Sequence, residues 1–163
     1  MHDIRTIEAA DTPGFYRELI AQAEGLLHDE RDAVANAANL SALIYHAVAD
    51  LNWAGFYFLK SANELVLGPF QGKVACVRIP VGKGVCGTAV AEGRSQLVPD
   101  VHAFAGHIAC DAASRSELVV PVARDGAMIG VLDLDSPVPG RFTAEDQAGF
   151  EALAALYVAA SDF

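Results

Sequence analysis

Basic residues are scarce in this sequence: 11 lysines and arginines stand against 21 aspartates and glutamates over 163 residues. The formal net charge is therefore -10 at pH 7. Such an acidic chain repels phosphate backbones and anionic lipid headgroups. We accordingly expect neither nucleic acid nor a membrane surface among its partners.

Long apolar runs and a secretory leader are also lacking. No stretch of about 18 residues is uniformly apolar, as a membrane-spanning helix requires. Residues 1–15 hold no basic stretch followed by an apolar one, which is the pattern of a signal peptide. We therefore expect a cytoplasmic protein. Hydrophobic residues make up 53% of the chain and charged residues 20%, a balance that favours a folded chain over disorder or a coiled coil.

Cysteine is rare and its number is odd, because the chain holds only Cys76, Cys86 and Cys110. An odd number in a chain expected in the cytoplasm argues against a structural disulfide framework. Each thiol is then either an inert packing residue or a reactive one. Their spacing fits no zinc-binding template, and the five histidines do not gather around them. We therefore expect no metal site.

The hydrophobic pattern changes twice along the chain and indicates three regions. Residues 1–50 show a helical period, residues 51–136 hold a run of short strands, and residues 143–161 return to a helix. No repeat, low-complexity tract or linker interrupts the chain, so we expect a single domain over residues 1–163. This order of elements favours the α+β class, with an antiparallel sheet flanked by the N-terminal and C-terminal helices.

Local signals mark where the helices begin. Thr12 followed by Pro13 is typical of a helix N-cap with proline at the first helical position. A second helix is expected over about residues 32–49. Thr143 and Asp146 have the spacing of a capping box, with aspartate in place of the usual glutamate or glutamine, and they predict the start of the closing helix.

The middle region alternates between strand and turn signals. A glycine-rich break opens a short helix over residues 85–92, and Gly93 ends it. A loop is expected from residue 99 to about residue 114. The expected strands are residues 53–59, 64–67, 75–79, 96–98, 117–123 and 127–135.

Cys110 is distinctive because it falls in this loop rather than in an apolar periodic element. Gly106, His107 and Asp111 lie near it, and loops carry functional residues more often than cores do. The sequence leaves two interpretations of Cys110 open, a reactive thiol and an ordinary packing residue. A nearby histidine lowers the pKa of a thiol, but a lone loop histidine such as His107 is usually solvated.

Packing is the favoured interpretation of the other two cysteines. Cys76 shares the less apolar face of an expected strand with Arg78. Cys86 falls in the first turn of the short helix, where the helix dipole favours a thiolate. The glycines and alanine around Cys86 nevertheless indicate tight packing.

Two aspartates on one strand are more informative. Asp133 and Asp135 are two residues apart and therefore share a face. Aspartate is depleted in strands, so this is either a solvent-facing strand end or a functional site. A three-residue hairpin loop at 124–126 places Glu117 opposite Asp133, whereas a two-residue turn at 125–126 places Glu117 on the other face. We expect the first register, in which three carboxylates require a positive partner, either a metal or an ammonium group.

An aromatic stripe precedes the acidic strands in the sequence. Trp53, Gly55 and Tyr57 alternate on one face of the first expected strand. Such a stripe is most often core. Beside an anionic patch, it equally suits the wall of a pocket for an apolar or cationic ligand.

Five stretches of the sequence together resemble one family. They are residues 52–57, 68–72, 79–87, 107–111 and 130–136. The pattern is similar to that of the free methionine-(R)-sulfoxide reductases, which are stand-alone GAF-domain enzymes. The likeness covers nearly the whole chain, and the three cysteines together with the three carboxylates make it specific. It implies a single GAF domain with a GAF-like fold.

The resemblance also implies a chemistry. Cys110 matches the family's catalytic cysteine, whose thiolate attacks the sulfoxide sulfur while an acid, Asp135 or Glu117, protonates the departing oxygen. The resulting sulfenic acid would condense with Cys76, the matching resolving cysteine, to form a disulfide. Cys86 would serve as a second resolving or relay thiol. Thioredoxin would reduce the disulfide, and no bound cofactor is required.

The same resemblance implies a substrate and partners. Asp133, together with Glu117 and Asp135, would hold the α-ammonium group of free methionine sulfoxide, which a peptide-bound methionine lacks. Trp53 and Tyr57 would form the wall around the methyl-sulfoxide end. The family further suggests a homodimer and a role under oxidative stress. A non-catalytic GAF domain that senses a small molecule is the alternative interpretation, and it leaves the three thiols unexplained.

Overall fold

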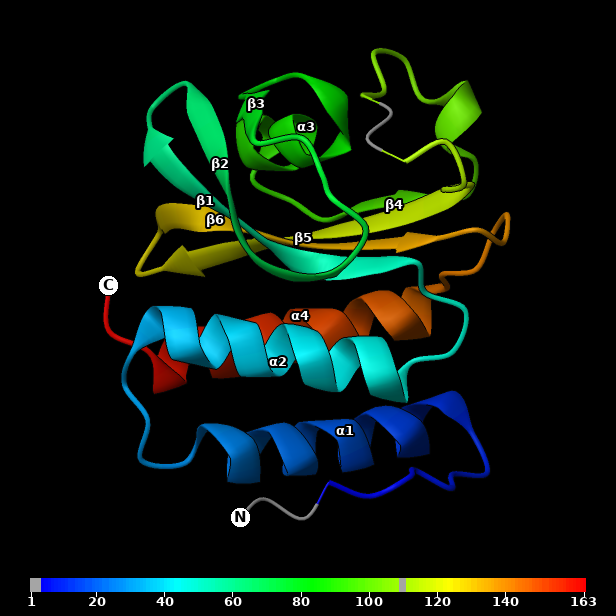
Figure 1. Ribbon diagram of the computed structural model, residues 1–163, viewed down its shortest axis with the longest axis vertical. Helices are drawn as coiled ribbons and strands as arrows, with labels where there is room; N and C mark the ends of the chain where they lie inside the picture. Colours follow the sequence, from blue (N-terminus) through cyan, green and yellow to red (C-terminus); the bar gives the residue numbers. More distant parts are fainter. Residues whose placement is uncertain (1–3, 109–110) are drawn as a thin grey trace.

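A six-stranded antiparallel sheet forms the middle layer of the protein (Figure 1). The structure is a computed structural model and describes residues 4–108 and 111–163. The strands lie in the order β3-β2-β1-β6-β5-β4. Their bounds are β1 (Trp53–Ser61), β2 (Glu64–Gly72), β3 (Arg78–Pro80), β4 (Gln96–Val98), β5 (Ser116–Arg124) and β6 (Ala127–Ser136).

Helices cover both faces of this sheet (Figure 1). They are α1 (Thr12–Leu27), α2 (Ala33–Ala47), α3 (Gly84–Glu92), α4 (Ala144–Ala160) and the short 3-10 helix η1 (Val101–Ala103). Helices α2 and α4 lie against one face with α1 packed outside them, and α3 covers the opposite face. The α+β class and the flanking helices predicted from the sequence are confirmed. Among the described residues, no helix is long and apolar enough to cross a membrane.

Successive side chains of β1 point alternately to the two faces of the sheet. Ala54 and Phe56 are buried in the core formed with α2 and α4. Trp53 and Tyr57 belong to a second buried cluster on the α3 side of the sheet. Because Asp135 of β6 lies directly opposite Trp53, the β6 aspartates also lie on the α3 side. One face of the sheet thus packs against α2 and α4, and the other face carries the aromatic and acidic side chains predicted as site residues.

The start of α1 differs from the sequence prediction by one residue. Its N-cap is Asp11, whose carboxylate accepts a hydrogen bond from the amide of Gly14 at 2.7 Å. Thr12, expected as the cap, is the first helical residue, because the carboxylate before it reaches the amide of the third helical residue. Pro13 still lies in the first turn, where a missing N–H group leaves no helical hydrogen bond unmade.

The other helix boundaries follow the sequence signals. The carboxylate of Asp32 caps α2, which ends two residues earlier than predicted, at Ala47. Thr143 and Asp146 make both hydrogen bonds of the predicted capping box at α4. Gly93 ends α3 in the left-handed conformation, with a φ of 63°.

The strand predicted over residues 75–79 is wrong in its position. Strand β3 is shorter and begins at Arg78, so Cys76 lies in the irregular segment before it rather than on a strand face. Strand β2 is longer than predicted because it pairs with β1 along its whole length, as far as the pair of Trp53 and Gly72.

The hairpin between β5 and β6 has a two-residue turn, so the predicted three-residue loop is wrong. Arg124 pairs with Ala127, and Asp125 and Gly126 have φ angles of 51° and 81°. Positive φ at both central residues is the conformation of a type I′ turn, which matches the twist of paired strands.

A β-bulge then restores Glu117 to the face of the aspartates. Val122 pairs with Gly130, but the next pair is Ala123 with Met128, so Ile129 is an extra residue in β6. This shift places Glu117 opposite Asp135 rather than opposite Asp133. The three carboxylates therefore share one face as predicted, with a different cross-strand pair.

We predict that Gly149→Ala destabilises the protein, because the new Cβ would collide with the ring of Tyr16 where α1 packs on α4. Overpacking of this kind costs about 1–3 kcal/mol of unfolding free energy. Gly25→Ala is the matched control, because it also lies in a helix and has no atom within 4 Å of the new Cβ. It should stabilise by up to about 1 kcal/mol. Urea unfolding of both variants measures the difference, and an equal effect of the two changes would contradict this packing.

Candidate functional site

A cavity of about 40 Å³ lies on the α3 side of the sheet, with walls from β1, β5, β6, α3, β3 with the segment before it, and the segment between η1 and β5. It gathers residues that the sequence separates by up to 82 positions. The predicted site residues that line it are Trp53, Tyr57, Cys86, Glu117, Asp133 and Asp135. Cys76 is not among the lining residues, and Cys110 lies outside the described residues.

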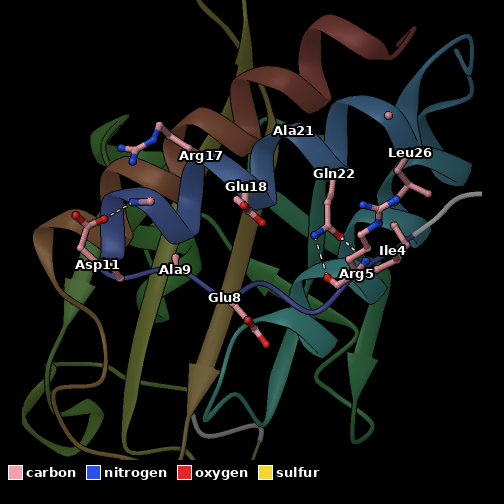
Figure 2. Close-up of a pocket in the computed structure, with 13 residues that line it drawn as sticks. Ile4, Arg5, Glu8, Ala9, Asp11, Arg17, Glu18, Ala21, Gln22 and Leu26 are labelled. Atoms are coloured by element: carbon pink, nitrogen blue, oxygen red, sulfur yellow. Dashed lines mark hydrogen bonds between the residues drawn. The ribbon is translucent and has the colours of Figure 1, made fainter.

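A larger hollow lies far from this chemistry. Figure 2 shows an open groove of about 860 Å³ between the N-terminal segment and the outer side of α1. Arg5 and Gln22 hydrogen-bond across it, and Asp11 caps the helix at its other end. No cysteine or histidine is among its described lining residues. The groove is larger than the cavity on the α3 side, but it lacks the thiol and imidazole groups found there.

Stacked aromatic rings form one wall of the cavity. The ring of Trp53 lies 5.7 Å from that of Tyr57 and 5.2 Å from that of Phe70, with interplanar angles of 25° and 14°. The Tyr57 hydroxyl donates to the carbonyl of Cys76 at 2.9 Å. Gly55 is required here, because a Cβ would press on the Phe70 side chain and the Trp53 ring. The sequence assigned no role to Phe70, which comes from the neighbouring strand.

The opposite side of the cavity is acidic. Glu117 and Asp133 are each only 6% exposed. Burial raises the pKa of Asp133 to about 6, and hydrogen bonds to Cys86 and Glu117 oppose the rise. Burial and the neighbouring carboxylates raise the pKa of Glu117 and that of Asp135 well above the usual range. No lysine or arginine is among the described lining residues, so the negative charge has no fixed cationic partner.

Cys86 lies against this acidic group as a buried free thiol. Its sulfur and one carboxylate oxygen each of Glu117 and Asp133 all lie within 4.8 Å of one another. Burial raises the pKa of the Cys86 thiol well above its usual value, and both carboxylates raise it further. These effects outweigh the helix dipole that favours a thiolate at this position. The sequence shows no spacing that relates Cys86 to the acids.

Side-chain hydrogen bonds tie the loop before β5 to the sheet. The side-chain amide of Asn52 donates to Asp111 at 3.3 Å and to Ser114 at 3.1 Å, and its backbone amide donates to the Asp135 carbonyl. The amide of Ala113 lowers the pKa of Asp111. Asn52 stands directly before the aromatic stripe in the sequence, and this adjacency was the only available signal for it.

His107 is not solvated as the sequence suggested. Its side chain is 15% exposed, and its Nε2 lies 3.7 Å from a carboxylate oxygen of Glu117. Burial lowers the pKa of His107, and His102 lowers it further. The lowered pKa disfavours the imidazolium form beside Glu117.

The sheet order and the position of the cavity on the α3 face define a class of protein, the GAF domain. The family model with the description "GAF domain" matches residues 35–161. The free methionine-R-sulfoxide reductase of Escherichia coli (strain K12) is 57% identical over 141 residues, which cover 86% of this chain and 85% of that protein. The free methionine-R-sulfoxide reductase of Saccharomyces cerevisiae is 47% identical over 146 residues, which cover 85% of this chain and 81% of that protein.

A solved structure agrees with these sequence relatives. The free methionine-R-sulfoxide reductase from Neisseria meningitidis, solved in complex with its substrate, superposes with a TM-score of 0.93 at 45% identity. The match covers 98% of this chain and 95% of that one. This protein therefore belongs to the free methionine-R-sulfoxide reductase family of GAF-domain proteins.

We predict that the ligand-free protein loses stability as the pH rises through the titration of Asp133. The pKa of Asp133 is raised from 3.8 to about 6, so the folded state binds more protons than the unfolded chain in this window. The unfolding free energy must then fall as the pH rises between these values. Asp133→Asn removes this contribution, so its pH profile should be flatter and its stability at pH 7 higher. Thermal unfolding across this range measures the effect.

Asp29→Asn is the control for this experiment, because Asp29 is an exposed aspartate in a left-handed conformation that asparagine tolerates. Its profile should parallel that of the parent protein. Parallel profiles for the parent and Asp133→Asn would contradict the raised pKa.

Proposed function

We propose that this protein reduces free L-methionine (R)-S-oxide to L-methionine. The observation that carries the proposal is a single cavity with stacked aromatic rings on one side and three carboxylates on the other, of which two are buried and one, Asp135, is partly buried. An amino acid with a polarised sulfoxide group presents a cationic end and a methyl-sulfinyl end, so it complements both sides. The substrate complex of the Neisseria meningitidis relative supports this assignment.

Substrate binding rests on the acidic side of the cavity. Asp133, with Glu117 and Asp135, accepts hydrogen bonds from the substrate's α-ammonium group, which supplies the missing positive charge. Trp53 and Tyr57 enclose the methyl-sulfinyl end. A peptide-bound methionine sulfoxide has an amide instead of an ammonium group, so it would leave the buried carboxylates unpaired. The enzyme is therefore selective for the free amino acid.

The attacking group in the proposed reaction is the thiolate of Cys110, which forms a bond to the sulfoxide sulfur. Glu117 or Asp135 donates a proton to the sulfoxide oxygen, directly or through water, as the sulfur–oxygen bond breaks. Burial and the neighbouring carboxylates raise the pKa of both carboxyls, which favours the protonated form that this step requires. Water then attacks the Cys110 sulfur and the bond between the two sulfur atoms breaks, so that methionine leaves reduced by two electrons and Cys110 is oxidised to a sulfenic acid.

Cys76 resolves the sulfenic acid in this scheme. Its thiolate attacks the sulfenic sulfur, a disulfide forms, and the hydroxyl leaves as water. In the structure Cys76 is disulfide-bonded whereas Cys86 is free, which favours Cys76 as the resolving thiol and leaves Cys86 a relay role. Thioredoxin supplies the two electrons that restore both thiols by exchange, so no bound cofactor takes part.

The size of the cavity indicates that the oxidised form is closed. A cavity of about 40 Å³ holds one or two water molecules and not an amino acid. Val74 and Ala75, close before Cys76, form part of its wall. We therefore expect reduction of the disulfide to release this segment and admit the substrate. The cytoplasmic location, the homodimer and the role under oxidative stress remain predictions from the sequence.

We predict that Cys110→Ser abolishes turnover in a thioredoxin-coupled assay of NADPH consumption with the free R epimer. Without the attacking thiol no sulfenic acid forms. Cys76→Ser keeps the attacking thiol, so it should release about one equivalent of methionine per chain and then stop. The S epimer, run in parallel, should not be reduced by the parent protein. Full turnover by Cys110→Ser would refute the assignment, and no turnover by the fully reduced parent would favour the sensor alternative.

We predict that Asp133→Asn raises the KM for free methionine-(R)-sulfoxide. Loss of one charged hydrogen-bond partner is worth about 1.5–3 kcal/mol, or roughly tenfold to a hundredfold in affinity. N-acetylated methionine sulfoxide should be a poor substrate for the parent protein for the same reason. Asp29→Asn, which removes an exposed carboxylate in the turn between α1 and α2, is the control and should keep the parent KM. Equal use of the free and acetylated substrates would contradict ammonium recognition.

A further inference from the structure

A mixed sulfur and oxygen donor set lies at the floor of the cavity. The thiol of Cys86 from α3, a carboxylate oxygen of Glu117 from β5 and one of Asp133 from β6 lie within 4.8 Å of one another. All three side chains are buried. Zinc–sulfur and zinc–oxygen bonds are about 2.3 and 2.0–2.2 Å, so ligands around one zinc ion lie roughly 3.3–3.7 Å apart. The three donors need to close by only about 1 Å to share an ion.

One carboxylate oxygen of Asp133 points to a ligand independently of the clustering. Oδ1 of Asp133 is fully buried and has no hydrogen-bond partner among the described residues, while Asp133 itself lines the cavity. A buried carboxylate oxygen without a partner costs free energy that a bound cation recovers. No described lysine or arginine lines the cavity to play that part. The cavity of about 40 Å³ has the size of an ion with a water molecule.

We propose that Cys86, Glu117 and Asp133 form a binding site for a thiophilic divalent cation of the Zn²⁺ class, within the cavity that the proposed reaction uses. The thiol gives up its proton to solvent when the metal–sulfur bond forms, and the two carboxylates supply oxygen ligands. The fourth position faces the cavity and takes water. No residue changes its oxidation state.

The donor set selects among cations. A thiolate is a poor ligand for Mg²⁺ and Ca²⁺, which prefer six or more oxygen ligands, whereas zinc accepts sulfur and oxygen in a four-coordinate site. The site is therefore selective for soft or borderline ions.

Metal binding has a consequence that rests on the proposed function. The ion would occupy the place of the substrate's ammonium group between Glu117 and Asp133. Zn²⁺ would then be a competitive inhibitor with respect to free methionine sulfoxide, and it would block the reaction without oxidising a thiol. The metal site itself is tested without any activity measurement.

The test uses the full chain carrying Cys76→Ser and Cys110→Ser, in which Cys86 is the only thiol. Co²⁺ alone is the spectroscopic probe, and Zn²⁺ alone displaces it. We expect one Co²⁺ per chain, with a thiolate-to-cobalt charge-transfer band that Zn²⁺ abolishes. Adding Cys86→Ser should remove the band, and adding Asp133→Asn should weaken binding roughly tenfold or more, since even outer partners of a metal site have effects of this size.

Asp29→Asn in the same background is the control and should bind Co²⁺ like its parent. Circular dichroism checks that every variant is folded, and Cys86→Ala replaces Cys86→Ser if the latter is not. Absence of Co²⁺ binding by the folded double variant would overturn the proposal. Binding that survives both the Cys86 and Asp133 changes would also overturn it. Neither outcome affects the reductase assay, so the two proposals fail separately.

Discussion

The gathering of three carboxylates on one face of a sheet is the constraint on which the site depends. Glu117 and Asp133 are buried, Asp135 is partly buried, and all three line the same cavity as the rings of Trp53 and Tyr57. Like charges in such a place raise one another's pKa values, and the group must take up protons or a cation. The proposed binding of an ammonium group, the proposed donation of a proton to the leaving oxygen and the proposed metal site all depend on this one electrostatic property.

A local irregularity in the backbone brings the third carboxylate to this group. The Asp125-Gly126 turn by itself would direct Glu117 to the packing face of the sheet. The bulge at Ile129 adds one residue to β6 and reverses the outcome. Gly130 follows directly, and a Cβ there would collide with the carbonyl of Tyr57, so β1 and β6 approach closely at this point. Turn and bulge together determine the charge of the cavity.

The fold determines where the cavity lies, and the side chains that line it determine which ligand it suits. A GAF-type sheet with helices on both faces accommodates many ligands, so fold membership alone says little about chemistry. Here the stacked rings of Trp53, Tyr57 and Phe70 form a rigid apolar wall. The Asn52 amide hydrogen-bonds to Asp111 and Ser114 and so holds the segment directly before β5 beside the acids. These contacts make the cavity suited to a small zwitterion with an apolar end.

The features that local chemistry determines could be predicted from the sequence. Caps at Asp32 and Thr143 mark helix starts because capping needs only neighbouring residues. The shared face of Asp133 and Asp135 follows from the two-residue period of a strand. Three thiols and three acids in family-like stretches were enough for the family assignment.

Only the tertiary structure decided which distant residues meet. The partner of Glu117 depends on a bulge that no local signal marks, and the start of β3 depends on pairing with β2. The contact of Cys86 with the acids requires α3 to pack on the sheet, which sequence spacing does not encode. Helix caps and strand faces are properties of neighbouring residues, whereas a buried site is a property of packing between elements far apart in the chain.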